Sequence, residues 1–421
     1  METTKKKFNL RRFAFSALIL YIVLLIGPIV GIDIPVVYAA IKANPLQLVQ
    51  FLIIGIYNGA IIEIIALGYT MVYGIIELIN FAHGDVYMIG VFTSLTVLSV
   101  TGTLESKDPG KIIFGLILAL IVAVVFCALL NAAIERLAYR RLRNAPRLAP
   151  LISAIGMSFI IENVGLMWAA QAWLVPSFGT TGGASQKVFP DMLGILFKSL
   201  GWDINLLASS GIALRLTIKD VLVIVLAVAL MTGLYLFVQR TRLGKAMRAT
   251  AQNRDAAKML GIDIDWVISA TFLIGGGLAG AAGLMAGLYN NTAWWFMGFR
   301  AGLQSFTAAV LGGIGNITGG MLGGFLIGLL ASFSDGYLNA RWTNALVFAT
   351  LVLILLFRPT GLLGEQTGQK PKRFDEKYQI RYHFWHYWWS ADFPFWRLVC
   401  CHHRQFNGSR AWVGNGRQVR A

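Results

Sequence analysis

Charged residues and cysteines are both scarce in this sequence, and each shortage excludes a class of protein. Charged side chains make up 13% of the 421 residues, whereas 57% of the residues are hydrophobic. A soluble domain carries about 25% charged residues, so this chain is too apolar to be one. The only cysteines are Cys127, Cys400 and Cys401. A small secreted scaffold held together by disulfides needs a denser cysteine framework.

The sequence also lacks the patterns of a nucleotide-binding, metal-binding or catalytic protein. No Walker A pattern, G-x-x-x-x-G-K-[ST], is present, so any ATP must bind elsewhere. His83 has no second metal ligand at helical spacing, and the adjacent residues 400–403 (CCHH) cannot easily wrap one tetrahedral ion. An enzyme that used His83 and Asp85 as an acid/base pair would still lack a nucleophile. We therefore expect no catalytic residues, no metal and no cofactor.

Long apolar runs dominate what is present. A helix needs about 20 apolar residues to cross the roughly 30 Å hydrocarbon core of a bilayer. Runs of this kind lie near 13–31, 49–67, 84–101, 111–133, 150–173, 219–238, 264–288 and 342–358, with a longer, glycine-broken stretch at 302–333. The first run lacks a small-residue cleavage pattern, so we expect it to be retained. The sequence predicts an all-α, polytopic transmembrane bundle of about 8 to 10 spans.

The formal charge of +16 is distributed along the chain as in a membrane protein. Basic residues gather at the N-terminus, in the loops 135–147 and 239–258, and in the C-terminal tail. The first three groups alternate with the apolar runs as cytoplasmic loops do under the positive-inside rule. We therefore expect both termini in the cytoplasm, and contact with membrane lipid but not with nucleic acid.

The stretch 68–90 is apolar enough to lie in a bilayer, yet Asn80, His83 and Asp85 interrupt it beside Gly84. Ionisable groups at membrane depth are expensive and normally face a pathway or a protein interior. Irregular backbone at that depth must line a cavity or be covered by protein. These residues therefore predict a broken helix that lines a pore. The alternative is a helix cap, in which Asn80 and Asp85 bond the free backbone amides around Gly84.

A second break is predicted within 302–333, where the segment 307–328 is rich in glycine. If this stretch were one simple span, the basic C-terminus would lie outside the cell, against the charge rule. We therefore expect two half-helices, discontinuous or re-entrant, that meet near Gly315 and Asn316. A helix pair packed closely through small residues is the alternative, and both descriptions can hold together.

The basic segment 243–266 predicts one surface helix over 245–260. Its residues are good helix formers, and Gly261 stands where a terminating glycine is expected. The helix combines small residues with charges: Ala249, Ala251, Ala256, Ala257, Arg248, Arg254, Asp255 and Lys258. Such a helix can seat its backbone in the cleft of a partner. The alternative is an amphipathic helix on the membrane surface, which the few apolar residues and the missing aromatic anchor disfavour.

Carboxylates inside or beside the apolar runs need an explanation, because a buried, unpaired carboxylate is costly. Glu63, Glu77 and Glu162 each require a partner, a watery face or a helix end. Trp294 and Trp295 predict the outer membrane interface, where aromatic side chains are enriched.

Several motifs together resemble one family of transporters. Asp255-Ala256-Ala257, three residues and then Gly261 is similar to the E-A-A-x-x-x-G signature of ABC importer permeases, with Asp in place of Glu and without the closing Leu-Pro. ALGYTMVYGII, LINFAHGDVYMIG, LISAIGMS and FTAAVLGGIGNITGGMLGG follow in the order and spacing of LivH-type permeases of branched-chain amino acid ABC importers. The resemblance covers residues 50–365 and closes with RPTGLLG.

The resemblance implies a transport subunit that is not itself an enzyme. Such a permease pairs with a second, LivM-like permease and binds two cytoplasmic ABC ATPases. A periplasmic or lipid-anchored amino-acid-binding protein delivers leucine, isoleucine, valine or related amino acids. The segment 245–261 would be the coupling helix, with Arg248, Arg254, Asp255, Ala256, Ala257 and Gly261 as coupling residues. The translocation pathway or gate would contain Tyr69, Tyr73, Asn80, His83, Asp85, Gly315 and Asn316.

On this interpretation the chain lies in the inner membrane of a prokaryote and has three parts. An N-terminal basic segment with an extra membrane helix spans 1–48, the permease domain spans 49–365, and a basic, aromatic tail without a counterpart in the family spans 366–421. A urea or amide permease of the same superfamily is an alternative. An ion-coupled secondary transporter, whose carboxylates carry the ion, is a further one, but it has no ATPase to dock.

Overall fold

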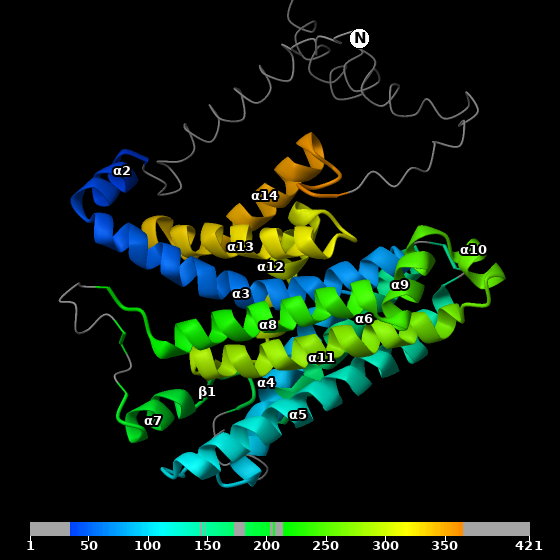
Figure 1. The fold of residues 1–421 in the computed structure, drawn as a ribbon. Helices are drawn as coiled ribbons and strands as arrows, with labels where there is room; N and C mark the ends of the chain where they lie inside the picture. Colours follow the sequence, from blue (N-terminus) through cyan, green and yellow to red (C-terminus); the bar gives the residue numbers. More distant parts are fainter. Residues whose placement is uncertain are drawn as a thin grey trace, which may run out of the picture. The chain divides into compact units, whose positions relative to one another are not determined.

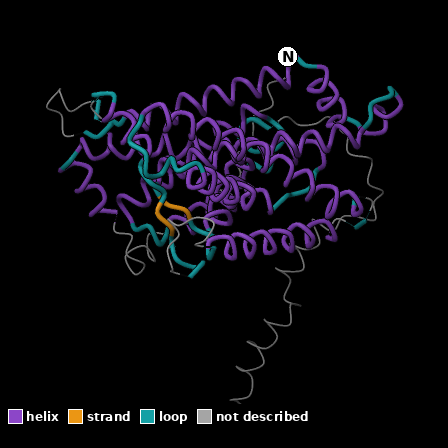
Figure 2. The backbone as a smooth tube through the Cα atoms, turned by 90° about the horizontal axis from the view of Figure 1, so that it is seen from below, coloured by secondary structure: helices purple, strands orange, loops and turns teal. Residues whose placement is uncertain are grey.

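A computed structural model describes residues 34–143, 145–146, 148–171, 182–202, 205–206 and 214–364 of the chain. The run predicted at 13–31, most of the segment 1–48 and the whole of the tail 366–421 lie outside these residues. The described part is almost entirely helical, which confirms the all-α prediction (Figures 1 and 2).

The helices and strands have the following bounds. The first half contains α2 (Ile34–Ala43), α3 (Pro45–Ile76), α4 (Ala82–Val100), α5 (Pro109–Ile134), the π-helical turn η1 (Glu135–Tyr139), the 3-10 turn η2 (Arg140–Leu142), α6 (Leu148–Ala169), β1 (Lys187–Val188) and α7 (Met192–Ser199). The second half contains α8 (Ile218–Arg240), α9 (Arg242–Gln252), α10 (Arg254–Met259), α11 (Ile264–Asn290), β2 (Thr292–Ala293), α12 (Met297–Gly312), α13 (Ile317–Phe333), the π-helical turn η5 (Ser334–Leu338) and α14 (Thr343–Phe357).

Seven helices of the described residues are long and apolar enough to cross a membrane. They are α3, α4, α5 continued to Leu142, α6, α8, α11, and α13 continued to Leu338. The helices α4, α6, α8 and α11 begin and end within a few residues of an apolar run predicted from the sequence. In contrast, α3 and the continued α5 extend well past the runs predicted at 49–67 and 111–133, and α13 occupies only the second part of the stretch predicted at 302–333. The helix predicted at 342–358 is present as α14, but its 15 residues are fewer than the roughly 20 of a full crossing.

The bundle is built around α3, α4 and α11, whose residues are mostly buried. In contrast, α5, α6 and α8 expose large apolar side chains such as Phe114, Phe159 and Val225. Lipid solvates such side chains as well as a protein core does, so outward-facing apolar residues are stable in a bilayer. His83 and Asp85, which were singled out in the sequence, are buried on one of the central helices, α4.

Glycines bring the central helices unusually close together. A Cβ on Gly328 of α13 would overlap Gly59 of α3, and a Cβ on Gly280 of α11 would lie 2.5 Å from the Ala123 carbonyl oxygen of α5. Helices associate in membranes largely through such small-residue contacts, because there is no hydrophobic force between them. Close packing between α3 and α13 thus accompanies the helix break that the sequence predicts.

The two ends of the bundle differ. At one end, β1 and β2 form a two-stranded antiparallel pair with Lys187 opposite Ala293 (Figure 2). The indole nitrogen of Trp294 donates to the Ala184 carbonyl oxygen at 3.3 Å beside this pair. Figure 1 shows α7 and β1 at this end, and α9 and α10 at the opposite end, where α3 and α5 finish.

The prediction of one continuous helix over 245–260 is wrong. The segment forms α9 and α10, separated by Asn253, whose backbone is extended at φ −159° and ψ 110°. The Asn253 side chain accepts a hydrogen bond from the Ala256 amide at 3.0 Å and so caps the new helix. Asparagine competes with helical backbone bonding in this way, which composition alone did not reveal. Gly261 follows α10 at φ +79°, which confirms its predicted role as the terminating glycine.

Candidate functional site

The predicted break between α3 and α4 is present at residues 77–81, which we call the α3–α4 junction. Glu77 adopts the left-handed conformation at φ 56°, and its amide donates to the Tyr73 carbonyl oxygen at 2.8 Å. The exposed Glu77 carboxylate therefore sits at a helix end. The break precedes His83, Gly84 and Asp85, which belong to the first turn of α4.

The alternative cap prediction for Asn80 and Asp85 is wrong. No side chain caps α4. The Asn80 amide donates to Asn131 Oδ1 at 3.3 Å, and its Oδ1 accepts from the Tyr139 hydroxyl at 2.7 Å. Asn131 in turn donates to the Phe272 carbonyl oxygen at 2.7 Å. This buried chain of bonds ties the α3–α4 junction to α5, η1 and α11, which a local cap would not do.

Gly84 lets the backbone of α12 approach α4. A Cβ at this position would lie 2.5 Å from the Gly298 carbonyl oxygen and 2.6 Å from the Gly302 Cα. Neither atom belongs to a flexible side chain, so any larger residue must push the helices apart. The glycine is therefore required by packing inside a helix, and not by a turn.

Tyr69 and His83 lie together at the centre of the bundle. Both are buried, and their rings meet edge to face with centroids 4.9 Å apart. A Cβ on Gly68 would overlap the His83 ring, so this glycine makes room for the imidazole. The Tyr69 hydroxyl points at the Phe81 carbonyl oxygen, at 3.5 Å. Tyr73, one turn further along α3, is only half-buried.

Asp85 belongs to a buried group of polar residues shared between α4 and α6. Its Oδ2 accepts a hydrogen bond from the Ser158 hydroxyl, and Glu162, one turn further along α6, is also buried. Asp85 Oδ1 and Glu162 Oε1 each lack a hydrogen-bond partner. Glu63 of α3 is buried against Gly324 of α13, and its Oε1 also lacks a hydrogen-bond partner. Buried oxygens without a partner cost free energy in this conformation.

The second predicted break is also present, at residues 313–316, which we call the α12–α13 break. Gly313 and Gly315 have positive φ values of 111° and 92°, which favour glycine. Asn316 caps α13 by accepting from the Gly319 amide at 3.2 Å, and it donates to the Leu363 carbonyl oxygen at 2.8 Å. The positive φ of Gly315 and the hydrogen bonds of Asn316 give both residues a structural role in the break.

The closing motif RPTGLLG holds the last turn of α12. The Leu362 and Leu363 amides donate to the Leu311 and Gly312 carbonyl oxygens at 2.8 and 2.9 Å. These carbonyls belong to a helix end, where intrahelical partners are missing. The motif therefore supplies hydrogen-bond donors to a helix end whose carbonyl groups would otherwise lack partners.

The end of α3 contacts both the segment predicted to be the coupling helix and the α12–α13 break. Arg254 of α10 donates from Nη2 and Nε to the Ile75 carbonyl oxygen in the last turn of α3, at 2.8 and 3.3 Å. A Cβ on Gly74, in the same turn, would lie 3.1 Å from the Gly315 Cα of the α12–α13 break. The end of α3 is thus in contact with α10 and with the second broken helix.

Two of the remaining predicted coupling residues, Arg248 and Ala257, contact other parts of the protein, and two, Asp255 and Ala256, are exposed. Arg248 of α9 donates to the Gln239 side chain at 2.7 Å and to its carbonyl oxygen at 3.2 Å, so it fastens α9 to α8. Ala257 is buried, whereas Asp255 and Ala256 are exposed. Their coupling role stays a prediction.

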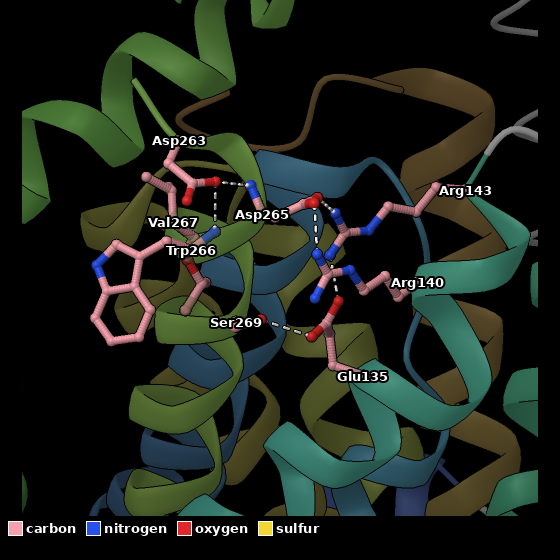
Figure 3. Close-up of polar contacts among 9 residues, drawn as sticks. Glu135, Arg140, Arg143, Asp263, Asp265, Trp266, Val267 and Ser269 are labelled. Carbon is pink, nitrogen blue, oxygen red and sulfur yellow. Dashed lines mark hydrogen bonds and ion pairs between the residues drawn. The ribbon is translucent and has the colours of Figure 1, made fainter. Parts of the chain in front are cut away.

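One polar cluster at this end was missed by the sequence analysis. It consists of Glu135, Arg140, Arg143, Asp265 and Ser269, and we call it the Glu135 cluster (Figure 3). Arg143 bonds both Glu135 and Asp265, Arg140 donates to Asp265 at 2.7 Å, and Ser269 donates to Glu135 Oε2 at 2.7 Å.

The Glu135 cluster joins η1 and η2 to the first turns of α11. Figure 3 shows Arg140 and Arg143 reaching from one side toward Asp265, with Glu135 placed between them and Ser269. Glu135, Arg140 and Arg143 come from the loop 135–147, in which the sequence indicated only an excess of basic residues. The spacing of Asp265 and Ser269, one helical turn apart, was the signal that could have indicated a shared face.

Comparisons with known proteins agree on one family. The family described as "Branched-chain amino acid transport system / permease component" matches residues 51–355. The permease protein BraD of the high-affinity branched-chain amino acid transport system of Pseudomonas aeruginosa is 37% identical over 326 residues, which are 76% of this chain and 97% of BraD. The corresponding LivH of Escherichia coli K12 is 36% identical over 325 residues, 77% of this chain and 98% of LivH.

More distant relatives carry related names. In Methanocaldococcus jannaschii, a probable branched-chain amino acid transport permease named LivH is 27% identical over 73% of this chain and 90% of its own length. A second protein of that organism, named LivM, is 29% identical over 31% of this chain and 43% of its own length. No solved structure matches the chain. The family match and the two relatives above 30% identity show that the chain belongs to the permease components of branched-chain amino acid transport systems.

Proposed function

We propose that this chain is the translocating permease subunit of an ATP-driven importer of branched-chain, hydrophobic amino acids, coupled to its ATPases through the segment 245–261. The observation that carries the proposal is the contact between α10 and the end of α3. It connects a surface segment bearing the D-A-A-x-x-x-G motif directly to a broken helix in the membrane. A permease that no ATPase drives would not need this contact between a surface segment and a membrane helix.

The exposed side of α10 is the surface that we assign to the ATPases. Asp255, Ala256 and Lys258 are exposed, and Met259 and Leu260 expose 88% and 80% of their surface. Large apolar side chains with this exposure on a charged, small-faced segment are typical of a docking site. Two ATPase subunits, one for this chain and one for a second permease of the LivM kind, complete the transporter, and a binding protein supplies the amino acid.

The same end of the bundle is assigned to the cytoplasm of a prokaryotic cell. The basic loops 135–147 and 239–258 both lie there, as the positive-inside rule requires. The N- and C-termini would then be cytoplasmic. The end with α7 and β1 faces outward, toward the binding protein.

The pathway or gate is formed by the polar and aromatic residues of the broken helices. Tyr69, His83 and Asp85 occupy the bundle centre. Tyr73 precedes the α3–α4 junction and Asn80 lies within it, and Gly315 and Asn316 belong to the α12–α13 break. The unpartnered oxygens of Asp85 and Glu162 support this assignment, because a transporter that alternates between two states can pair such atoms in the other state.

The alternatives are less well supported. The relatives reported above are named for branched-chain amino acids rather than for urea or amides. Membership of this permease family also disfavours an ion-coupled secondary transporter, in which Glu63, Asp85 or Glu162 would carry the ion.

Two substitutions in the docking segment test the function. Gly261→Pro is incompatible with φ +79° and removes the amide that donates to the Lys258 carbonyl oxygen at 3.0 Å. Asp255→Arg reverses an exposed charge without touching the core.

The partner permease, the ATPases and the binding protein are reconstituted with the chain in vesicles. The wild-type chain is expected to take up leucine only with ATP. Both variants are expected to insert normally but to lose that uptake. Glu105→Arg, an exposed charge reversal at the opposite end, is the matched control. Unimpaired ATP-dependent uptake by both variants would refute the coupling role.

A further inference from the structure

Arg254 behaves differently from the residues around it on α10. Asp255, Ala256 and Lys258 are exposed, but Arg254 is half-buried and turns toward the membrane bundle. Its guanidinium group donates twice to the Ile75 carbonyl oxygen. That carbonyl is in the last turn of α3, where no intrahelical amide remains to bond it. The contact is therefore a charge-assisted bond between a surface helix and the end of a pathway helix.

A second connection reaches the same place from the other side of α10. Residues 260–263 lead from α10 into α11, whose Asp265 and Ser269 belong to the Glu135 cluster. From Glu135, η1 continues to Tyr139, whose hydroxyl donates to Asn80 in the α3–α4 junction at 2.7 Å. Both connections start at α10 and finish within residues 75–80.

We propose that Arg254 and Tyr139 are positioning residues that transmit the displacement of α9 and α10 to the α3–α4 junction, and that this junction is the moving part of the gate. The proposal rests on the function proposed above and deepens it. Arg254 does not serve as a docking residue for an ATPase; it acts inward, through Ile75. Tyr139 holds the opposite side of the junction through Asn80.

The packing at the end of α3 carries the movement to the second broken helix. Gly74 and Gly315 approach so closely that a Cβ on Gly74 would lie 3.1 Å from the Gly315 Cα. A shift of the last turn of α3 must therefore shift the α12–α13 break as well. Packed elements that cannot deform continuously respond to such a shift by changing between discrete arrangements.

The test uses the complete transporter in lipid nanodiscs and vesicles. Arg254→Met removes both donors but keeps the apolar stem, Arg254→Lys keeps one cationic donor group, and Arg242→Met removes an exposed arginine of α9 as the matched control. Tyr139→Phe removes only the hydroxyl, and Tyr235→Phe, an exposed tyrosine of α8, is its control. The first readout is the amount of leucine taken up per ATP hydrolysed. The second is amide hydrogen exchange of residues 74–82, compared between nucleotide-free and vanadate-trapped transporter.

The expected result separates transmission from simple stability. ATP hydrolysis and ATPase binding should persist in Arg254→Met, while uptake per ATP falls by about tenfold, within the range of allosteric couplings. Arg254→Lys should fall between Met and wild type, and Tyr139→Phe should lower the same ratio. A residue that only stabilises the fold would lower uptake and hydrolysis together. In wild type, exchange of residues 74–82 should change on trapping, and this change should be lost in Arg254→Met.

Two results would overturn the inference. The first is an unchanged uptake-to-hydrolysis ratio in Arg254→Met. The second, which applies even if that variant does not fold, is a wild-type junction whose exchange is the same in both nucleotide states. A wild-type transporter without any ATP-dependent uptake would instead refute the proposed function, so the two failures are distinguishable.

Discussion

The polar residues of the bundle centre differ in whether their hydrogen bonds are complete. Asn80 is fully bonded, to Asn131 and Tyr139, whereas Asp85 and Glu162 each retain an oxygen without a partner. A complete buried hydrogen-bond network rigidifies a fold, whereas an incomplete one leaves polar atoms that a different conformation can pair. At this scale, Asn80 fastens the junction to Asn131 and Tyr139, while Asp85 and Glu162 are the groups whose environment a second state would change.

Replacement of Asn80 tests its structural role. Asn80→Leu leaves the Tyr139 hydroxyl and Asn131 Oδ1 without their partner, and each buried polar group left unpaired costs about 1–3 kcal/mol. We expect a lower thermal unfolding temperature in detergent and impaired transport. Asn163→Leu is the control, because that exposed side chain bonds only the Phe159 carbonyl oxygen of its own helix, at 2.8 Å. Equal stability of the two variants, with normal uptake kinetics in Asn80→Leu, would show that Asn80 is required neither for stability nor for transport.

The sequence identified the unusual residues but not their partners. Asn80, His83 and Asp85 stood out because polar groups are rare in apolar runs. Their partners Asn131, Tyr139 and Ser158 did not stand out in the sequence. Each becomes significant only when packing brings it to a residue far away in the chain. The same reason explains why the Glu135 cluster was missed.

The two broken helices belong to the scale of elements, and the sequence predicted both. Glycines and polar residues within apolar runs are local signals, so a break beside Gly84 and another near Gly315 could be anticipated. The first break lies at residues 77–81, a few residues before the predicted place. The division of 245–260 into α9 and α10 could not, since helix propensity favoured continuity and the decisive event was one Asn253 cap. The contact between α10 and α3 joins residues 179 positions apart, which no local pattern indicates.

The contact between η2 and α11 gives a matched pair of substitutions. The Glu135 side chain is fully buried and Arg143 is 13% exposed, whereas Arg140 and Asp265 are 47% and 50% exposed. Arg143→Met leaves a buried carboxylate without its cation, at a cost of about 3–5 kcal/mol. Arg140→Met breaks a surface pair worth about 0–1 kcal/mol. Chemical denaturation in mixed micelles should rank Arg143→Met as far less stable; similar midpoints would contradict the burial of the Glu135 cluster.

Close packing of α3 and α13 gives a second pair. Gly328→Ala puts a methyl group against the Gly59 backbone, and overpacking of this kind costs about 1–3 kcal/mol. Gly156→Ala in α6 meets nothing within 4 Å and should be neutral or stabilising by up to about 1 kcal/mol, from helix propensity. The comparison is made by thermal unfolding in detergent. A Gly328→Ala protein as stable as Gly156→Ala would show that the two helices do not approach as described.

At the scale of the whole molecule, the elements assigned to coupling meet the two helix breaks at one end of the bundle. The end of α3, the α12–α13 break, α10 and the Glu135 cluster lie in mutual contact or are joined through shared residues. This arrangement lets a force applied at one surface segment act on both broken helices. It requires that α10 meets a protein partner and does not lie in lipid.

Photo-crosslinking from the tip of α10 tests that requirement most directly. Met259, 88% exposed, is replaced by benzoylphenylalanine in the complete transporter, and Trp202, 59% exposed at the opposite end, is replaced in a parallel sample. After illumination, position 259 is predicted to form an adduct with an ATPase subunit and position 202 to form none with it. Adducts of position 259 with phospholipid alone would contradict the coupling role of α10, because the segment would then lie on the bilayer without contact to an ATPase subunit.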